Sequence, residues 1–146
     1  MLFKDCICFQ LGALSRKITR AYKESVASMG LTHGQFFMLI ALFDEDGVLP
    51  SQLADKAALD RPTTTGLLDR LERDGWIERM FDRTDRRTVR IHLTPKALER
   101  RAAILSTYEK INGHFLQKYS NEEWQPLQSL LGRLEEGEAV APNASR

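Results

Sequence analysis

Cysteine and histidine, which form disulfides and many metal sites, are scarce in this chain. Its 146 residues include two cysteines and three histidines. Cys6 and Cys8 are two positions apart on a segment that we expect to be helical, so they would point to nearly opposite sides and not pair with each other. The histidines are far apart, and none belongs to a metal-ligand motif. We therefore expect neither a metal site nor a bound cofactor.

Catalytic motifs are also missing from the sequence. It contains no glycine-rich phosphate loop, no nucleophile elbow and no recognisable pair of catalytic carboxylates. We therefore expect that the protein is not an enzyme.

Long hydrophobic runs are absent as well. No stretch approaches the roughly 18–20 apolar residues that cross a bilayer. Residues 1–6 lack the apolar region and the small-residue cleavage site of a signal peptide. We expect a cytoplasmic protein whose length supports a single domain with one hydrophobic core.

Positive charge is concentrated in one segment, although the formal net charge is only +1. Residues 82–90 contain four arginines and two aspartates, whereas residues 120–138 contain five glutamates and one arginine. The distribution of charge matters more than its total for nucleic-acid binding. The basic segment is therefore the candidate contact with DNA, and the acidic segment would face away from DNA or toward a partner chain.

Residues 60–75 carry the signals of a helix at both ends. Asp60 or Arg61 suits the N-cap, and Pro62 suits the first turn. Gly75 suits a left-handed stop. At the helical spacing, the face suited to the core consists of Thr64, Leu67, Leu68 and Leu71. The opposite face bears no large apolar group and consists of Pro62, Thr63, Gly66, Asp69, Arg70 and Arg73, with Thr65 at its flank.

Gly66 is unusual because a glycine inside a helix costs about 1 kcal/mol relative to alanine. Two explanations remain open. Either a bulky partner such as DNA approaches the backbone closely at this position, or the position is a tolerated surface glycine.

Two short strands and a basic loop follow this helix. Residues 76–81 and 88–93 have the composition of strands, and apolar and polar residues alternate in the second. The loop at residues 82–87 contains three arginines. A charged hairpin tip is most often only a solvated turn. Placed directly after a helix with a small, polar outer face, it favours the recognition helix and wing of a winged helix-turn-helix.

Further helices are expected before this module. Residues 6–29 form the first, with a core stripe of Leu11, Leu14, Ile18 and Tyr22. Residues 34–43, capped by Thr32, are too apolar for a surface helix and are expected at the centre. Residues 48–49 can add a short third strand, and residues 51–58 form the first helix of the helix-turn-helix.

Two more helices are expected after the wing. The first runs from Pro95 to about residue 119, and the second from a capping box at residues 120–123 to Gly137. Residues 138–146 have the composition of a flexible tail. The apolar stripes of the first and last two helices need more burial than a monomer of this size offers, so they indicate a partner chain.

These elements and their motifs resemble the MarR family of bacterial transcriptional regulators, roughly from Cys6 to Gly137. The most specific match is the wing segment 82–87 with Val89 and Leu93-Thr94, preceded by the segment 71–77; the segments 52–54 and 31–36 also match. The resemblance implies a mainly α fold with a small β-hairpin wing in one domain. Its expected parts are a winged helix-turn-helix at about 31–93 and dimerisation helices at about 5–30 and 95–137, within a domain spanning 1–137.

The resemblance also implies a function. A homodimeric repressor would bind double-stranded DNA at a pseudo-palindromic operator, with its recognition helices about 34 Å apart, one turn of DNA. A small molecule, often aromatic or anionic in this family, would release it.

Position on the outer face and the family pattern together assign the DNA contacts. Arg70 is suited to a guanine edge because a guanidinium bonds O6 and N7 together. At the wing tip, Asp85 would orient Arg87 into the minor groove. Ser51 and Gln52 begin a helix and would contact phosphates. The candidate residues are Ser51, Gln52, Arg61, Pro62, Thr63, Thr65, Arg70, Arg73, Arg83, Asp85, Arg86 and Arg87.

A second inducing signal remains open within the family. One branch senses organic hydroperoxides through a cysteine in its first helix, and Cys8 with Tyr22 resembles that branch. Tyrosines that hold the cysteine there are replaced by Gly12 and His33, which would leave the thiolate less reactive.

A winged helix that binds protein and not DNA is the alternative from another class. The arginines of the wing disfavour it, because such a module would be expected to lack them. Salt-dependent retention on DNA would separate the two classes.

Overall fold

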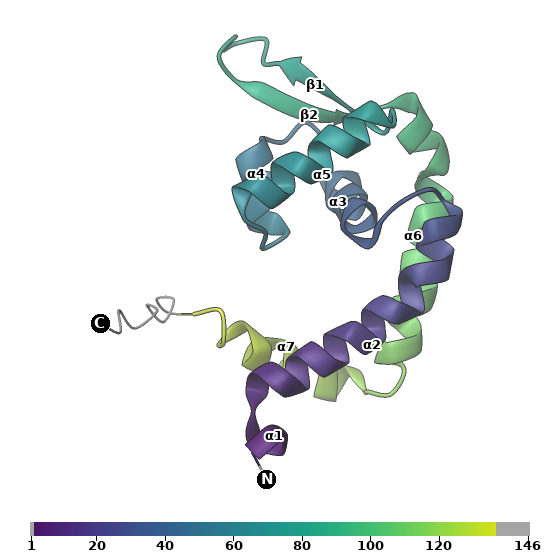
Figure 1. The fold of residues 1–146 in the computed structure, drawn as a ribbon, viewed down its shortest axis with the longest axis vertical. Helices are drawn as coiled ribbons and strands as arrows, with labels where there is room; N and C mark the ends of the chain where they lie inside the picture. Colours follow the sequence, from purple (N-terminus) through teal and green to yellow (C-terminus); the bar gives the residue numbers. More distant parts are fainter. Residues whose placement is uncertain (1, 137–146) are drawn as a thin grey trace. The chain divides into compact units, whose positions relative to one another are not determined.

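The computed structural model describes residues 2–136, in which seven helices accompany a two-stranded antiparallel sheet (Figure 1). This order confirms the mainly α fold with a β-hairpin wing. The chain divides into one compact unit that ends at Ile111 and a second that begins at Asn112. The elements are α1 (Leu2–Asp5), α2 (Ile7–Ser28), α3 (His33–Asp44), α4 (Pro50–Lys56), α5 (Arg61–Arg73), β1 (Ile77–Phe81), β2 (Val89–Leu93), α6 (Pro95–Leu116) and α7 (Asn121–Gly132).

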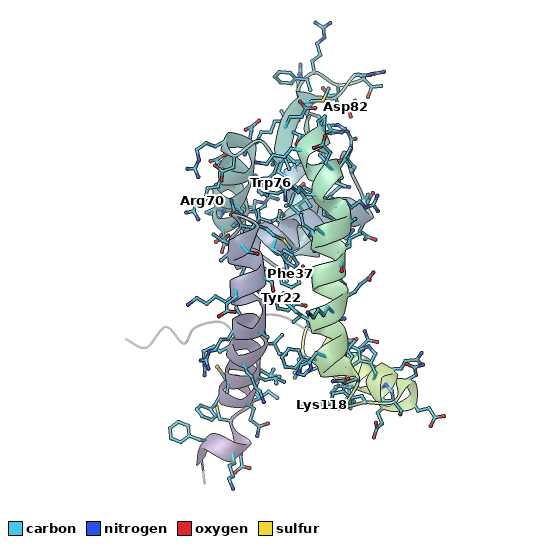
Figure 2. All side chains as sticks on the ribbon, turned by 90° about the vertical axis from the view of Figure 1, so that its right-hand side faces the viewer. Tyr22, Phe37, Arg70, Trp76, Asp82 and Lys118 are labelled. Carbon is cyan, nitrogen blue, oxygen red and sulfur yellow. The ribbon has the colours of Figure 1, made fainter. Side chains whose placement is uncertain are left out.

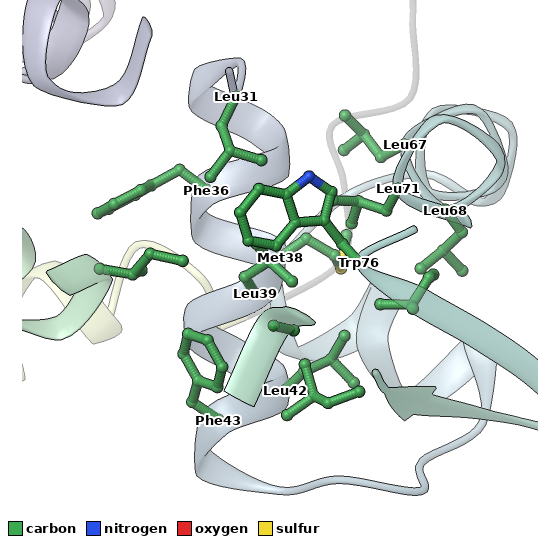
Figure 3. Packing of buried hydrophobic residues seen from close by; sticks show 14 of the residues in the cluster. Leu31, Phe36, Met38, Leu39, Leu42, Phe43, Leu67, Leu68, Leu71 and Trp76 are labelled. Atoms are coloured by element: carbon green, nitrogen blue, oxygen red, sulfur yellow. The ribbon is translucent and has the colours of Figure 1, made fainter. Parts of the chain in front are cut away.

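Helix α3 forms the centre of the first unit, as its composition predicted. Phe36, Leu39 and Leu42 on this helix are completely buried. Trp76, which connects α5 to the hairpin, packs into the same cluster (Figure 3). The predicted inner face of α5 is also buried and supplies Thr64, Leu67, Leu68 and Leu71. The recognition helix is therefore seated on the core through one face only.

Local hydrogen bonds explain where the helices of this module begin and end. The Thr32 hydroxyl accepts a hydrogen bond from the backbone N–H of Gln35, whose side chain accepts one from the Thr32 N–H at 2.9 Å. Asp60, not Arg61, is the N-cap of α5. Gly75 follows α5 with a φ of 77°, a left-handed conformation that glycine adopts at no steric cost.

The sheet has two strands, and the predicted third strand is wrong. Val48 forms only an isolated bridge with Ile91: its carbonyl accepts a hydrogen bond from the Ile91 N–H, and the neighbouring Gly47 N–H donates to the Ile91 carbonyl, both at 2.9 Å. Gly47 turns the chain with a φ of 72° immediately before Val48, and α4 begins at Pro50. Too few extended residues remain between the turn and the helix to make a strand.

The first predicted helix differs from α2 in its start and in its burial. Cys6 is an extended N-cap, and the short helix α1 precedes it. Tyr22, near the other end of the stripe, is buried, but Leu11 and Leu14 are 38% and 51% exposed. Only the half of the stripe that approaches α3 is covered within one chain.

The second unit contains the end of α6 and helix α7. The predicted capping box is confirmed, because Ser120 and Glu123 bond to each other's backbone N–H groups. Helix α6 ends at Leu116, not near residue 119, and α7 ends at Gly132, not at Gly137. Tight turns with i to i−3 hydrogen bonds follow Gly132, as at Glu135. The predicted tail at 138–146 lies outside the described residues.

Helix α7 has no buried side chain and contains Pro126, which the sequence reading had passed over. Trp124 is half-buried, with its ring centroid 6.5 Å from that of Tyr119. Leu130 on this helix and Leu134 in the turn that follows it are therefore exposed.

Within residues 2–136, no single helix is long and apolar enough to cross a membrane. Helices α2 and α3 pass that test only when taken as a pair, and the chain bends by 83° between them. The same residues contain no group of three or more metal-ligating side chains that could hold an ion.

Candidate nucleic-acid interface

The outer face of α5 is exposed and polar. Thr63, Thr65 and Arg70 are exposed, while Thr64, Leu67 and Leu68 turn into the core. Arg70 points away from the body of the first unit (Figure 2). Among the described residues no acid lies within ion-pair distance of Arg70, whereas Arg73 pairs with Asp74 at 3.1 Å. Arg70 is therefore the free cation of this face.

The start of α5 is held by Asp60. Its carboxylate accepts hydrogen bonds from the Thr63 N–H at 2.7 Å and from the Thr63 hydroxyl at 2.8 Å. The backbone bond and then the hydroxyl bond lower the pKa of Asp60, so the cap is charged at neutral pH. Because its hydrogen is committed to Asp60, the Thr63 hydroxyl is oriented to accept from a ligand, not to donate.

The start of α4 has a related arrangement. The Gln52 side-chain oxygen accepts a hydrogen bond from the Leu49 N–H at 2.8 Å. Its NH₂ group remains available as a donor. Sequence reasoning assigned Gln52 to DNA and missed this capping role, for which the position of Gln52 three residues after Leu49 was the available signal.

An open groove of about 360 Å³ joins α4, the start of α5 and the beginning of β2. Four of the predicted DNA-binding residues line it, and we call it the recognition groove: Ser51, Arg61, Thr65 and Arg87. These side chains come from three separate segments, so the fold brings together what the sequence had placed apart. Pro62 and Thr63 lie next to Arg61 on the exposed first turn of α5.

The wing tip is organised by Asp85. Its carboxylate accepts hydrogen bonds from the backbone N–H of Arg87 and from the Thr88 hydroxyl, both at 3.0 Å. Asp85 thus holds the backbone of Arg87, the arginine predicted to enter the minor groove, because an aspartate side chain readily closes a turn two residues ahead. Arg83, Arg86 and Arg87 are exposed, and no described acid pairs with them.

Two other arginines of the hairpin are paired and were not among the predicted contacts. Arg79 bonds to Asp69 at 2.7 Å and to Glu72. Arg90 bonds to Asp82 and donates a hydrogen bond to the Gly47 carbonyl at 2.9 Å. The hairpin register pairs Arg90 with Met80, two residues before Asp82, so Asp82 is a diagonal neighbour of Arg90 on the same face of the hairpin.

A second concave site lies along α2, at its junction with α3. This α2 pocket has a volume of about 490 Å³ and is lined by Arg16, Arg20 and Lys23, with Tyr22 and His33. None of the described lining residues is acidic. Desolvation lowers the pKa of His33, although its side chain keeps an exposed edge, so the positive charge comes from the other three residues. Their spacing along one helical face was the missed signal.

Cys8 and Tyr22, the predicted redox pair, occupy different environments on α2. Cys8 is a free, exposed cysteine near the start of the helix. Tyr22 is buried, and burial followed by the influence of Tyr108 raises its pKa. At 1.5 Å per residue, fourteen residues of helix separate the two by roughly 21 Å within one chain.

The chain was compared with known proteins. A sequence model of the MarR family matches residues 31–89. The chain is 33% identical over 132 residues to the HTH-type transcriptional regulator MgrA of Staphylococcus aureus, covering 90% of this chain and 88% of MgrA. It is 32% identical over 123 residues to the HTH-type transcriptional repressor YetL of Bacillus subtilis, covering 83% of this chain and 74% of YetL. A probable transcriptional regulator from Pseudomonas aeruginosa has a similar structure, with a TM-score of 0.78, 29% identity and coverage of 90% and 98%.

Proposed function

The chain belongs to the MarR family of transcriptional regulators, and from this premise we propose that it is a sequence-specific repressor of transcription. Helix α5 would enter the major groove of the operator, and the wing would reach the adjacent minor groove. The family consists of DNA-binding regulators and not of enzymes, which agrees with the absence of a catalytic motif from the sequence.

One observation supports this proposal above the others. Arg61 and Arg87 line the recognition groove, and Arg70 is exposed further along α5; no described acid pairs with any of the three. Arg79 and Arg90, by contrast, have acidic partners. Unpaired cations on one face can release counterions from a phosphate backbone, which supplies most of the affinity for DNA.

The proposed contacts divide by chemistry. Arg70 would read a guanine edge, and Arg87 would enter the minor groove. Thr63 and Thr65 would meet base edges as small hydrogen-bonding groups beside Pro62. Phosphate contacts would come from Ser51, Gln52, Arg61, Arg73, Arg83 and Arg86, with Asp85 holding the tip.

The decisive experiment is DNA binding by Arg87→Ala. An operator would first be isolated from a random pool with the wild-type protein, and affinities measured by fluorescence anisotropy. We expect Arg87→Ala to weaken binding by at least about tenfold, as for loss of one minor-groove cation. Arg100→Ala, an exposed arginine on α6, is the matched control and should bind as the wild type does. Wild-type protein that enriches no DNA would favour the protein-binding alternative.

We also propose that the functional unit is a homodimer. The exposed apolar side chains outside the winged module include Leu11 and Leu14 on α2, Leu130 on α7, and Leu134 just after α7. A second copy that covers these stripes would place two recognition helices on successive turns of DNA. One MarR-type domain over residues 1–137, with the helices flanking the winged module as its dimerisation part, is the organisation proposed.

We propose that the inducer is a small anion bound in the α2 pocket. Arg16, Arg20 and Lys23 are lining cations, and none of the described lining residues is acidic, so the pocket favours a ligand with a carboxylate. Tyr22 offers an aromatic surface on which a ring of such a ligand could pack. Such a ligand could act only by favouring a DNA-incompetent arrangement of the two recognition helices.

Benzoate and its neutral relative benzamide test this site. Benzoate should release operator DNA in the millimolar range or below, and benzamide should not, because only benzoate has the charge that Arg16, Arg20 and Lys23 attract. Arg20→Ala should raise the benzoate concentration needed, while leaving DNA affinity without ligand unchanged. Equal action of both compounds would refute an anion site.

Oxidation of Cys8 is the second candidate signal, because its thiol is exposed and accessible to oxidants. Cumene hydroperoxide should then release DNA from the wild type and from Cys6→Ser, but not from Cys8→Ser. Cys6, also exposed, is the matched control. If every protein stays bound or all release equally, Cys8 is not the sensor.

A further inference from the structure

The outer half of the β1–β2 hairpin has little apolar packing to hold it. Ile91 and Leu93, at its base, are buried in the core. Met80 and Phe81, toward the tip, are 46% and 71% exposed. An isolated two-stranded hairpin is only marginally stable. Polar contacts must therefore set the direction in which the tip points.

Arg90 supplies contacts of this kind from the middle of β2. One guanidinium nitrogen donates to the Gly47 carbonyl in the turn between α3 and α4, at 2.9 Å. Its Nε donates to the carboxylate of Asp82 at the end of β1. The Asp82 side chain is only 14% exposed, so this charged hydrogen bond is partly shielded from water.

Asp82 continues the connection into the tip. It accepts hydrogen bonds from the Thr84 N–H at 2.8 Å and from the Thr84 hydroxyl at 2.7 Å. Its own N–H donates to the Thr88 carbonyl at 2.8 Å. Arg90 and then Thr84 hold the pKa of Asp82 well below its usual range, so the network is charged at neutral pH. Bonds thus run without interruption from Gly47 to the loop that carries the wing arginines.

We infer that Arg90 is a positioning residue of the wing: it ties the tip to the turn between α3 and α4 and holds Arg87 beside α5 without contacting DNA itself. The assignment of Arg87 to DNA rests on the proposed function. The contacts of Arg90 with Gly47 and Asp82 do not rest on the proposed function, because all their atoms lie within the chain. Two measurements separate these parts.

The first measurement needs no DNA. Hydrogen exchange of backbone amides should become at least several-fold faster across residues 82–88 in Arg90→Leu, while peptides from α3 and α5 keep their protection. Glu78→Gln, at an exposed position on β1 of the same hairpin, is the control and should leave exchange unchanged. Unchanged exchange at residues 82–88 in Arg90→Leu would overturn the inference whatever the protein binds.

The second measurement is a double-mutant cycle on operator DNA. Arg90→Leu should weaken binding by about tenfold, because a loose wing must be ordered on binding. Its salt dependence should stay that of the wild type, whereas Arg87→Ala should lower the slope by about one. The double variant should lose less affinity than the sum of the two single losses, since Arg90 acts in part through Arg87.

Additive effects, or a lower salt slope in Arg90→Leu, would make Arg90 a direct DNA contact and overturn the positioning role. Absence of binding by the wild type would reject the proposed function, and the exchange measurement would still decide the role of Arg90. If Arg90→Leu fails to fold, Asp82→Asn replaces it, because the amide keeps an acceptor for Thr84 but loses the charge. Arg90→Lys should restore the exchange protection and the DNA affinity only in part, since one ammonium cannot reproduce the two contacts that the guanidinium makes with Asp82 and Gly47.

Discussion

Gly66 lies on α5 where a side chain would meet open space, because a methyl group there would have no atom within 4 Å. Nothing in the fold requires a glycine at this position. Gly66→Ala should therefore stabilise the protein by about 1 kcal/mol, the helix-propensity difference. If DNA approaches the backbone here, operator affinity should fall at the same time.

Urea unfolding and anisotropy on one preparation test both parts. A more stable variant with unchanged affinity would identify Gly66 as a tolerated surface glycine. A variant that loses stability would contradict the open space around the position.

Arg70 lies in the last turn of α5 on its outer face, and unlike Arg73 it has no described acid paired with it (Figure 2). Arg70→Ala should lower the ratio of specific to non-specific affinity by about ten- to a hundredfold, as for loss of a bidentate guanine contact. Non-specific affinity should change less. Competition between operator and random-sequence DNA measures the ratio, and an equal loss on both DNAs would make Arg70 a phosphate contact.

At the scale of elements, the start of α5 depends on one charged cap. Asp60→Ala should lower the melting temperature and the operator affinity, because α5 would lose its cap and Thr63 its orientation. Asp60→Asn should retain the melting temperature but not the full operator affinity, since its one oxygen can accept the backbone bond whereas its NH₂ group cannot accept the bond from the Thr63 hydroxyl. Thermal melts and anisotropy of the two variants check this, and equal losses would assign the effect to charge alone.

Acid should remove part of this stabilisation. The folded-state pKa of Asp60 lies below its unfolded value of about 3.9. The charged cap therefore stabilises the fold fully above that pH, and its contribution is lost as the pH falls through the folded-state pKa. The difference in melting temperature between wild type and Asp60→Asn should be constant near neutral pH and should change below about pH 4. A difference in melting temperature that stayed constant down to about pH 2 would contradict this role of the charged Asp60 cap.

The elements with local signals at their ends were predictable, and those that depend on distant contacts were less so. Asp60, Pro62 and Gly75 delimit α5 within a few residues of chain, so its bounds and inner face could be read directly. The prediction of a third strand failed because two apolar residues, Val48 and Leu49, do not show that a turn and a helix leave no room for a strand between them. The apolar stripe of α2 predicted which face of this helix is apolar. It did not predict which half of that face is covered by other residues of the chain.

The recognition groove shows the same limit at the level of the site. Its members were each predicted, from helix starts and from the wing. Their meeting around one groove needed the fold. Arg90 was counted only as part of a basic segment, because a sequence shows charge but not which charges are neutralised by a partner.

At the scale of the whole molecule, the exposed leucines of α7 permit a test of assembly. Leu130→Asp should shift the protein from dimer to monomer at micromolar concentration and should weaken operator binding, because two half-sites would no longer be held by one particle. Ser129→Asp, with the same charge at a neighbouring exposed position, is the control. Analytical ultracentrifugation and anisotropy measure both effects, and a wild type that sediments as a monomer would contradict the dimer.

The two tryptophans of the chain fall one in each unit, which makes the protein its own spectroscopic probe. Trp76 is buried beneath the ammonium of Lys96, 4.5 Å from the ring centroid, whereas Trp124 is partly open to solvent. Iodide should quench the fluorescence of Trp124 well before that of Trp76. Trp76→Phe and Trp124→Phe would each leave a single emitter, so the intrinsic fluorescence of these two proteins would report separately on the winged module and on the C-terminal helices as either responds to DNA or to an inducer.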